Sequence, residues 1–286
     1  MSISNSTTLN DLVGQIVSSE AQSAAYGARV MRPLVHSVQV PAGAGSIVIP
    51  RFQALTVAGL TEGVAPASSA WSTDGVTLTP AERGVYVEIA KRALYADPFS
   101  DLVPYGEQMG RALALDEDEQ ILAQASGFVS QFASGVFEGA PKETIIDSIS
   151  ILEASGCPGP YFGVFHPTAW AYVRQDLSDA SAFASVGKRT VEGFGQGFTN
   201  MQGYVGSPYG IPCFISNKVA ATSTGAGYYC NAIFGREALG YAFMQDITVD
   251  VDDNKVGRKF DLMGWYAGQA ATLVSNYGVG IRSIKA

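Results

Sequence analysis

Residues 100–127 carry a long helical pattern. Positions three and four residues apart share one face of a helix, and here that face is apolar: Leu102, Tyr105, Met109, Ala112 and Leu113. Ser100 or Asp101 could cap the first turn, and Pro104 fits there because a first-turn N–H has no partner inside the helix. We predict one helix of roughly 39 Å, which is long for a globular domain.

Four consecutive carboxylates lie on this predicted helix: Asp116, Glu117, Asp118 and Glu119. Like charges spaced three or four residues apart cost a helix roughly 0.2–0.5 kcal/mol per pair. The plain interpretation is a solvated helix face, and the alternative is a set of ion pairs with another subunit. A paired-carboxylate catalytic site is disfavoured because nothing nearby in the sequence supplies a base or a metal ligand.

The first 37 residues have the pattern of an N-terminal arm with an amphipathic helix. Its apolar positions follow the spacing i, i+3, i+4, i+7 and i+8 and are Leu9, Leu12, Val13, Ile16 and Val17. Pro33 ends the helical pattern. Such a stripe must pack on something, and the sequence leaves open whether that is the chain's own domain or a neighbouring subunit.

The pattern changes to alternation over residues 38–80. Residues 38–40 and 47–49 are short alternating runs around a Pro-Ala-Gly-Ala-Gly turn, which predicts a β-hairpin. The stretch that follows is too poor in large apolar residues to hold a core by itself. We expect an extended excursion whose few apolar side chains need cover from another chain. These side chains are Phe52, Val57, Leu60 and Trp71.

The remaining elements alternate between strand and helix, which indicates a mixed α/β layer. Residues 81–96 predict a strand that leads into the long helix, and residues 264–286 predict a long strand or strand pair that returns to the same sheet. Between them we expect helices at 143–155, from Pro167 and at 236–243, and strands at 159–165, 209–219, 227–235 and 247–252.

Composition favours burial in an assembly. Hydrophobic residues make up 47% of the 286 residues and charged residues only 15%, against about 25% charged in a typical soluble chain. A net charge of −8 argues against broad nucleic-acid binding, which needs a positive surface. We expect no membrane span, because no run of ~18 apolar residues occurs, and no signal peptide, because the first residues lack a basic region.

The residues that usually carry catalysis are few. His36 and His166 are isolated in the sequence and are expected to be structural, and the three cysteines have neither disulfide nor zinc spacing. The Gly-Phe-Gly-Gln-Gly run at 193–197 lacks the setting of a dinucleotide-binding loop. We therefore predict no catalytic, cofactor or metal site.

The order of these elements resembles the HK97-type major capsid protein of tailed bacteriophages. The stretches that match in kind are ALYADPFSDLV at 93–103, RALALDEDEQILAQASG at 111–127, GPYFGVFHPTAWAYVRQDL at 159–177, YGIPCFISNKV at 209–219, AIFGREALGYAF at 232–243 and YGVGIRSIKA at 277–286. Each stretch is weakly specific, whereas their order is more so, and together they span nearly the whole chain.

The resemblance implies an α+β, HK97-like capsid fold. Its parts would be an N-terminal arm at 1–37, an E-loop hairpin at 38–80, a peripheral-domain strand and spine helix at 81–135, an α/β axial domain at 136–259 and a C-terminal strand at 260–286 that returns to the peripheral domain. The carboxylates at 116–119 and the apolar residues of the arm and E-loop are then candidate contacts between subunits.

The implied function is structural. Copies of the chain would form hexamers and pentamers of an icosahedral shell around double-stranded DNA, in a virion assembled in the host cytoplasm, with no enzyme activity, cofactor or membrane. Expected partners are the chain itself, a portal, a separate scaffolding protein and possibly a decoration protein. The nearest alternative is an encapsulin-like bacterial compartment shell; a surface-layer protein and an enzyme with an unrecognised site are more distant ones.

Two features depart from some relatives of that family. Some of them crosslink an E-loop lysine to another subunit, but residues 38–90 contain no lysine, so we expect no such isopeptide bond. Some carry a long N-terminal scaffolding segment, whereas about 37 residues precede the hairpin here, which is why we expect the scaffold to be a separate protein.

Overall fold

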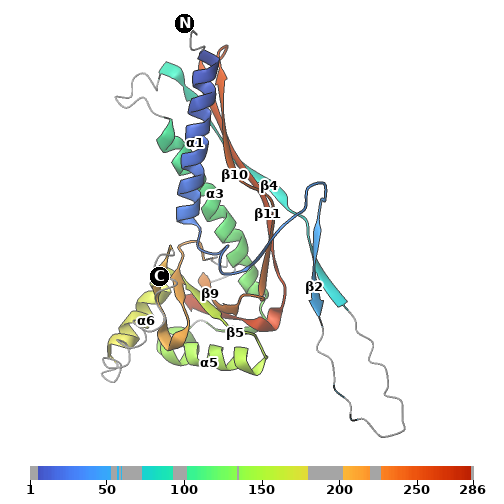
Figure 1. Ribbon diagram of the computed structural model, residues 1–286. Coiled ribbons are helices and arrows are strands. Elements are labelled where there is room, and N and C mark those ends of the chain that lie inside the picture. Colours follow the sequence, from blue (N-terminus) through green and yellow to red (C-terminus); the bar gives the residue numbers. More distant parts are fainter. Residues whose placement is uncertain are drawn as a thin grey trace, which may run out of the picture.

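Two β-sheets and a projecting two-stranded ribbon form the architecture (Figure 1). The structure is a computed structural model, and it describes residues 6–52, 57, 59, 73–92, 102–133, 135–179, 202–219 and 227–284. Among the described residues, no helix is long and apolar enough to cross a membrane.

The first sheet has four strands in the order β1, β10, β11 and β4. Their bounds are His36–Gln39, Leu239–Asn254, Lys259–Thr272 and Ala81–Ala90. Strand β1 runs parallel to β10, and the other pairs are antiparallel. Strands β10 and β11 have 16 and 14 residues, so they form a long hairpin that sets the length of this part of the molecule.

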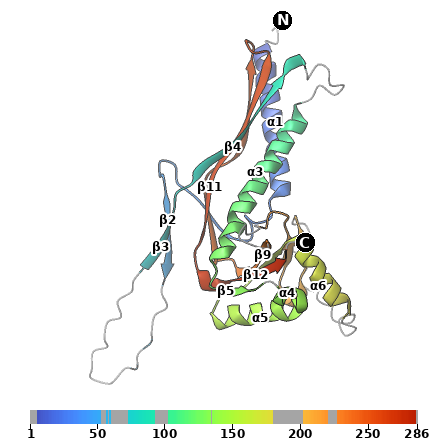
Figure 2. The same cartoon turned by 180° about the vertical axis from the view of Figure 1, so that it is seen from behind.

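Two helices cover one face of this sheet, α1 (Ser6–Ala28) and α3 (Val103–Ala123) (Figures 1 and 2). They approach closely because α3 has glycines at 106 and 110: a Cβ at Gly106 would lie 2.5 Å from a Cγ of Val17, and a Cβ at Gly110 would overlap the Ala21 carbonyl. Val17 and Ala21 share an apolar cluster with residues of α3 and the sheet, including Met109.

The second sheet has six strands in the order β5, β12, β9, β6, β8 and β7. Their bounds are Ser130–Phe132, Gly278–Ile284, Tyr228–Gly235, Tyr161–Phe165, Cys213–Ile215 and Tyr204–Gly206. Three helices accompany it: α4 (Val136–Gly139), α5 (Pro141–Ala154) and α6 (Pro167–Asp179). Residues such as Ile145, Trp170 and Val173 bury one apolar cluster against this sheet.

The other main cluster joins the two sheets. It combines Val30 and Met31, which follow α1, with Ile121 and Leu122 at the end of α3 and with side chains of β6, β9 and β10. A short 3-10 helix, η1 (Gln124–Gly127), extends α3 toward β5. Two further 3-10 turns, η3 (Pro208–Gly210) and η4 (Ser275–Tyr277), lie beside β8 and β12.

The ribbon consists of β2 (Ile47–Phe52) and β3 (Thr73–Leu78), paired antiparallel with Ile47 opposite Leu78. It stands away from the two sheets in both views (Figures 1 and 2). At its base, Ile49 and Leu78 join Val40, Ala242 and Leu273 in an apolar cluster.

Several sequence predictions are confirmed. The long helix begins with Pro104 in its first turn and continues through η1 to Gly127. Helix α5, the buried strand β6 and helix α6 lie where the patterns placed them, and β11 pairs with β4 as expected of the returning C-terminal stretch. The glycine at 156 ends α5 with a φ of 71°.

Three predictions are wrong in their pairing or type. Residues 38–40 do not pair with 47–49, because β1 instead bonds to β10 and leaves β2 to pair with β3. Residues 236–243 are not a helix: Ala238 closes a turn on Gly235, and β10 begins at Leu239. Strand β12 joins β9 and β5 in the six-stranded sheet rather than returning to the sheet of β4.

The start and the stripe of the long helix also differ from expectation. Leu102 occupies the N-cap position without a side-chain hydrogen bond, and Ser100 and Asp101 lie outside the described residues. Tyr105 and Ala112 are exposed, because Gly106 and Gly110 face α1 in their place. Apolar spacing alone does not show that a neighbouring backbone will occupy the glycine side of a helix.

Candidate assembly interface

The ribbon offers the clearest surface for another chain. Val48 in β2 is 56% exposed, although its opposite neighbour Thr77 belongs to a regular ladder. Val57, beyond the end of β2, is 95% exposed. Apolar side chains that their own chain leaves uncovered mark contact surfaces when they gather on a projecting element, so the ribbon can place them against a neighbour.

Other predicted contact residues of the arm and E-loop are placed less fully. Phe52 ends β2, and Leu9 and Leu12 lie in α1, but their side chains are outside the described part of the structure. Leu60 and Trp71 lie outside the described residues altogether. Ile16 is 45% exposed, whereas Val17 next to it is buried against α3. The arm therefore packs on its own domain through one face and leaves Ile16 free for contact.

The face of the four-stranded sheet opposite α1 and α3 is a second candidate surface, one that the sequence patterns did not single out. Tyr86 and Met263 are cross-strand neighbours on β4 and β11, and both are about half exposed. They border a shallow groove of about 510 Å³ that also includes Val85 and Trp265. The alternation of β4 predicted the strand, but no pattern in the sequence showed that its outer face would carry apolar side chains.

A network of charged and hydroxyl groups lies beside the apolar side chains of this surface. The Lys259 ammonium lies 2.5 Å from Glu88 and 3.3 Å from Asp261. The Tyr86 hydroxyl lies 2.8 Å from Glu88 and 3.0 Å from Asp261, and its hydrogen bond to Glu88 is the main cause that raises the pKa of Tyr86 to about 12. The hydrogen bond from Lys259 lowers the pKa of Glu88.

The four consecutive carboxylates do not share one environment. Asp116 pairs with Arg83 at 3.0 Å and accepts a hydrogen bond from Tyr266 at 2.6 Å, and Glu119 pairs with Lys218 at 3.1 Å. Both are partly exposed, so a contact between subunits stays a prediction for them. Glu117 and Asp118 are 1% and 0% exposed, so for these two both the solvated face and the inter-subunit contact are wrong.

Glu117 belongs to a buried ionic cluster at the junction of α1, α3 and β10. Its carboxylate lies 2.8 Å from Arg29 and 3.7 Å from Arg32. Both guanidinium groups also pair with Asp246, Arg29 through a short hydrogen bond and Arg32 at 3.1 Å. The basic partners come from the end of the arm, which is why the acidic run alone could not reveal its burial.

Burial and charge shift the pKa values of these carboxyl groups in opposite directions. Burial raises the pKa of Glu117, against the attraction of Arg29 and Arg32. Burial raises the pKa of Asp118 to about 7, although the backbone N–H groups of Met31 and Val30 favour its charged form. At Asp246 burial acts upward too, but the hydrogen bond from Arg29 and the nearby positive charges outweigh it and lower the pKa to about 2.

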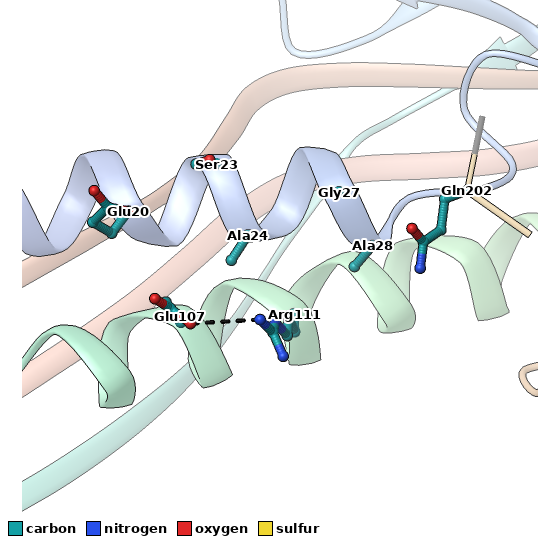
Figure 3. A pocket seen from close by; sticks show the side chains of 8 residues that line it. All are labelled: Glu20, Ser23, Ala24, Gly27, Ala28, Glu107, Arg111 and Gln202. Carbon is teal, nitrogen blue, oxygen red and sulfur yellow. Dashed lines mark hydrogen bonds and ion pairs between the residues drawn. The ribbon is translucent and has the colours of Figure 1, made fainter. Parts of the chain in front are cut away.

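A polar groove of about 510 Å³ runs between α1 and α3 (Figure 3). Small residues line it, Ala24, Gly27 and Ala28, together with Glu107 and Arg111, which form an i,i+4 ion pair at 3.5 Å. Among the described residues that line it, no buried polar groups converge as they would in a catalytic site.

The histidine at 166 is held as a structural residue. Its ring stacks on Tyr229 with a centroid separation of 3.5 Å, and its Nδ1 lies 2.7 Å from the Thr168 hydroxyl. Its backbone N–H donates to the buried Asn231 side chain, and burial lowers the pKa of its imidazole. Across the described residues no group of three or more histidine, cysteine or acidic side chains is arranged to hold a metal ion.

Comparison of the sequence and of the fold with known proteins gives different results. No family model and no curated protein matches the sequence. The fold matches the capsid structure of cyanophage P-SCSP1u with a TM-score of 0.66 and 14% identity, over 91% of this chain and 89% of that chain. It also matches a Microbacterium phage Oxtober96 structure with a TM-score of 0.66 and 14% identity, over 90% of this chain and 91% of that one.

A third similar structure is described as a virus-like particle and not as a phage. The crystal structure of a virus-like particle from Pyrococcus furiosus matches with a TM-score of 0.62 and 10% identity, over 93% of this chain and 98% of that one. These likenesses extend over nearly the full length of the chains, at identities too low to carry residue roles across. The chain therefore has the α+β, HK97-like fold of phage capsid proteins.

Proposed function

We propose that this chain is the major capsid protein of a tailed bacteriophage, a structural protein without enzyme activity. Copies of it would form hexamers and pentamers of an icosahedral shell that encloses double-stranded DNA. The observation that carries the proposal is the fold likeness to phage capsid structures over about nine-tenths of the chain. The projecting ribbon supports it, because Val48 and Val57 are exposed apolar side chains that a neighbouring copy could cover.

The proposed partners follow from the same capsid function. Each subunit would contact its neighbours through the ribbon and the outer face of the four-stranded sheet, and a portal, a scaffolding protein and possibly a decoration protein would complete the particle. The acidic net charge of −8 fits a wall that surrounds DNA without binding it tightly. Assembly would take place in the host cytoplasm, and the virion would be the final location.

The alternative, an encapsulin-like compartment shell, is not favoured, because two of the three similar structures described are phage structures. The virus-like particle has the same fold, so fold alone does not separate the two functions. What the particle encloses does separate them: DNA for a phage shell and a protein cargo for a compartment.

Electron microscopy of the protein expressed alone and together with the products of its neighbouring genes tests this proposal. We expect closed, uniform shells when the scaffolding partner is present, and nuclease-resistant DNA inside particles made in infected cells. Only monomers or small discrete oligomers under both conditions would contradict the proposal. Closed shells that contain a protein and no DNA would favour the compartment instead.

A further inference from the structure

Asp118 is a fully buried carboxyl group that holds backbone rather than a side chain. Its Oδ2 accepts the N–H of Val30 and its Oδ1 accepts the N–H of Met31, both at 2.9 Å. These residues follow Ala28, the last residue of α1, and their side chains enter the core beside the six-stranded sheet. One side chain of α3 therefore fixes the point where the arm joins the rest of the molecule.

The charges around this carboxyl group are already balanced without it. Arg29 and Arg32 each pair with both Glu117 and Asp246, so two cations meet two carboxylates. No ion pair joins Asp118 to a cation among the described residues. When Asp118 is ionised, the buried cluster therefore contains one negative charge more than its cations neutralise, and such a charge is costly in a dry interior.

Each element packed around the cluster contributes titratable or charged groups. The end of α1 and the residues after it supply Arg29 and Arg32, and α3 supplies Glu117. Strand β10 supplies Asp246 and Tyr241, and the Tyr241 hydroxyl faces Glu117 with a pKa raised by burial. The neighbouring carboxyl group of Asp116 has its own partners, Arg83 and Tyr266.

We propose that Asp118 is a proton-linked latch between the arm and the spine helix: with a proton bound it holds the end of α1 firmly on α3, and loss of the proton weakens that junction. The latch is a property of the single chain. It does not rest on the proposed shell function, and it can fail while that function stands.

The direction follows from the pKa of about 7 that burial gives Asp118 in the folded chain, above its ordinary value of 3.8. The folded junction holds the proton at pH values where an opened junction has lost it. The stabilisation is therefore complete below about pH 4 and is lost as the pH rises to about 7. Within this window, the equilibrium constant for opening the junction should rise by about tenfold per pH unit, because opening releases one proton.

Hydrogen–deuterium exchange measures the opening of this junction directly, because the two groups that Asp118 binds are backbone amides. The full-length chain is measured at pH 5, 6 and 7, and the rates are corrected for intrinsic exchange. We expect the protection of the Val30 and Met31 amides to fall as the pH rises. The Asp118→Asn variant has no titrating carboxyl group at this position, so it should lack the loss of about tenfold in protection per pH unit that is expected of the wild type. Glu119→Gln is the matched control and should keep the wild-type slope, because this carboxylate is 52% exposed and pairs with Lys218 outside the buried cluster.

Equal slopes in the wild type and in Asp118→Asn would overturn the latch. If the variant does not fold, measurements on the wild type alone still test the latch. Protection of the Val30 and Met31 amides that falls more steeply than that of β6 supports the latch, whereas an equal fall in both segments, or none, contradicts it.

Discussion

The junction of α1, α3 and the four-stranded sheet differs from the β2–β3 ribbon in how many of its side chains have contacts within the chain. At the junction, glycines allow two helix backbones to touch, and buried arginines and carboxylates pair with one another. On the ribbon, Val48 and Val57 are exposed, and Ile49 and Leu78 pack into an apolar cluster at its base. Helices α1 and α3 and the ribbon all come from the first half of the chain, yet the junction finds its partners within the chain, whereas the ribbon leaves Val48 and Val57 exposed.

This difference indicates which substitutions should affect folding of the single chain and which should affect assembly with a second copy. A change at the junction should act on the stability of the single chain, because every partner is within the chain. A change on the ribbon should leave the single chain intact and act on assembly, because the missing partner is another molecule. Substitutions in the two regions can test this distinction.

The largest effect on chain stability is expected at Glu117. Replacing Glu117 with alanine leaves Arg29 and Arg32 buried with one carboxylate fewer, and breaking a buried ion pair costs about 3–5 kcal/mol of unfolding free energy. The matched control is Glu119→Ala, two residues away, where the carboxylate is 52% exposed and its pair with Lys218 contributes about 0.2–1 kcal/mol. Urea unfolding of both variants measures the difference, and equal losses would show that the cluster is not buried as described.

The next effect is expected at the helix crossing. Gly110→Ala adds a Cβ that overlaps the Ala21 carbonyl, and overpacking of this kind costs about 1–3 kcal/mol. Gly27→Ala in α1 is the control, since its Cβ meets nothing within 4 Å and alanine favours a helix. Thermal unfolding should therefore separate the two variants in opposite directions. A neutral Gly110→Ala would mean that α1 and α3 do not pack this closely.

Acid should weaken the junction through Asp246. Its pKa of about 2 in the folded chain lies below the ordinary value of 3.8, so its ion pairs stabilise the fold above about pH 4 and are lost as the pH falls toward 2. Asp246→Asn should be less stable than the wild type at neutral pH, and the gap should close in acid. Stability measured at pH 2, 3, 4 and 7 checks this, and a gap that stays constant over that range would remove Asp246 from the acid response.

The smallest effect on chain stability is expected on the ribbon. Val48→Asp changes an exposed side chain, so its unfolding free energy should stay within about 0.5 kcal/mol of the wild type. Shell formation, followed by light scattering and electron microscopy, should nevertheless fall sharply. Val129→Asp is the control, because Val129 is 68% exposed on the body of the chain. Normal assembly of Val48→Asp would contradict a role for the ribbon in subunit contact.

Much of the fold could be predicted where local pattern and tertiary environment agree. The long helix, α5, and the β6–α6 unit with His166-Pro167 between strand and helix all follow from apolar spacing and the positions of prolines. Helices α5 and α6 bury the faces that their own sequences mark as apolar, as Ile145, Trp170 and Val173 show.

The errors arise where distant parts of the chain decide the outcome. Residues 236–243 have helical composition, but Tyr241 and Ala242 are buried as part of a strand between β1 and β11. The pairing of β1 with β10 joins residues about 200 positions apart, which local alternation does not show. The burial of Glu117 and Asp118 likewise depends on Arg29 and on the backbone of Val30, far away in sequence.

Hydrogen–deuterium exchange of assembled particles, compared with the unassembled fraction of the same preparation, tests the central claim most directly. The claim predicts that β2 and β3 become protected on assembly, because a second copy covers the ribbon, while the amides of α1 and α3 at the glycine crossing exchange equally in both states. Equal exchange of the ribbon in particles and free chains would contradict it and show that another chain does not cover the ribbon.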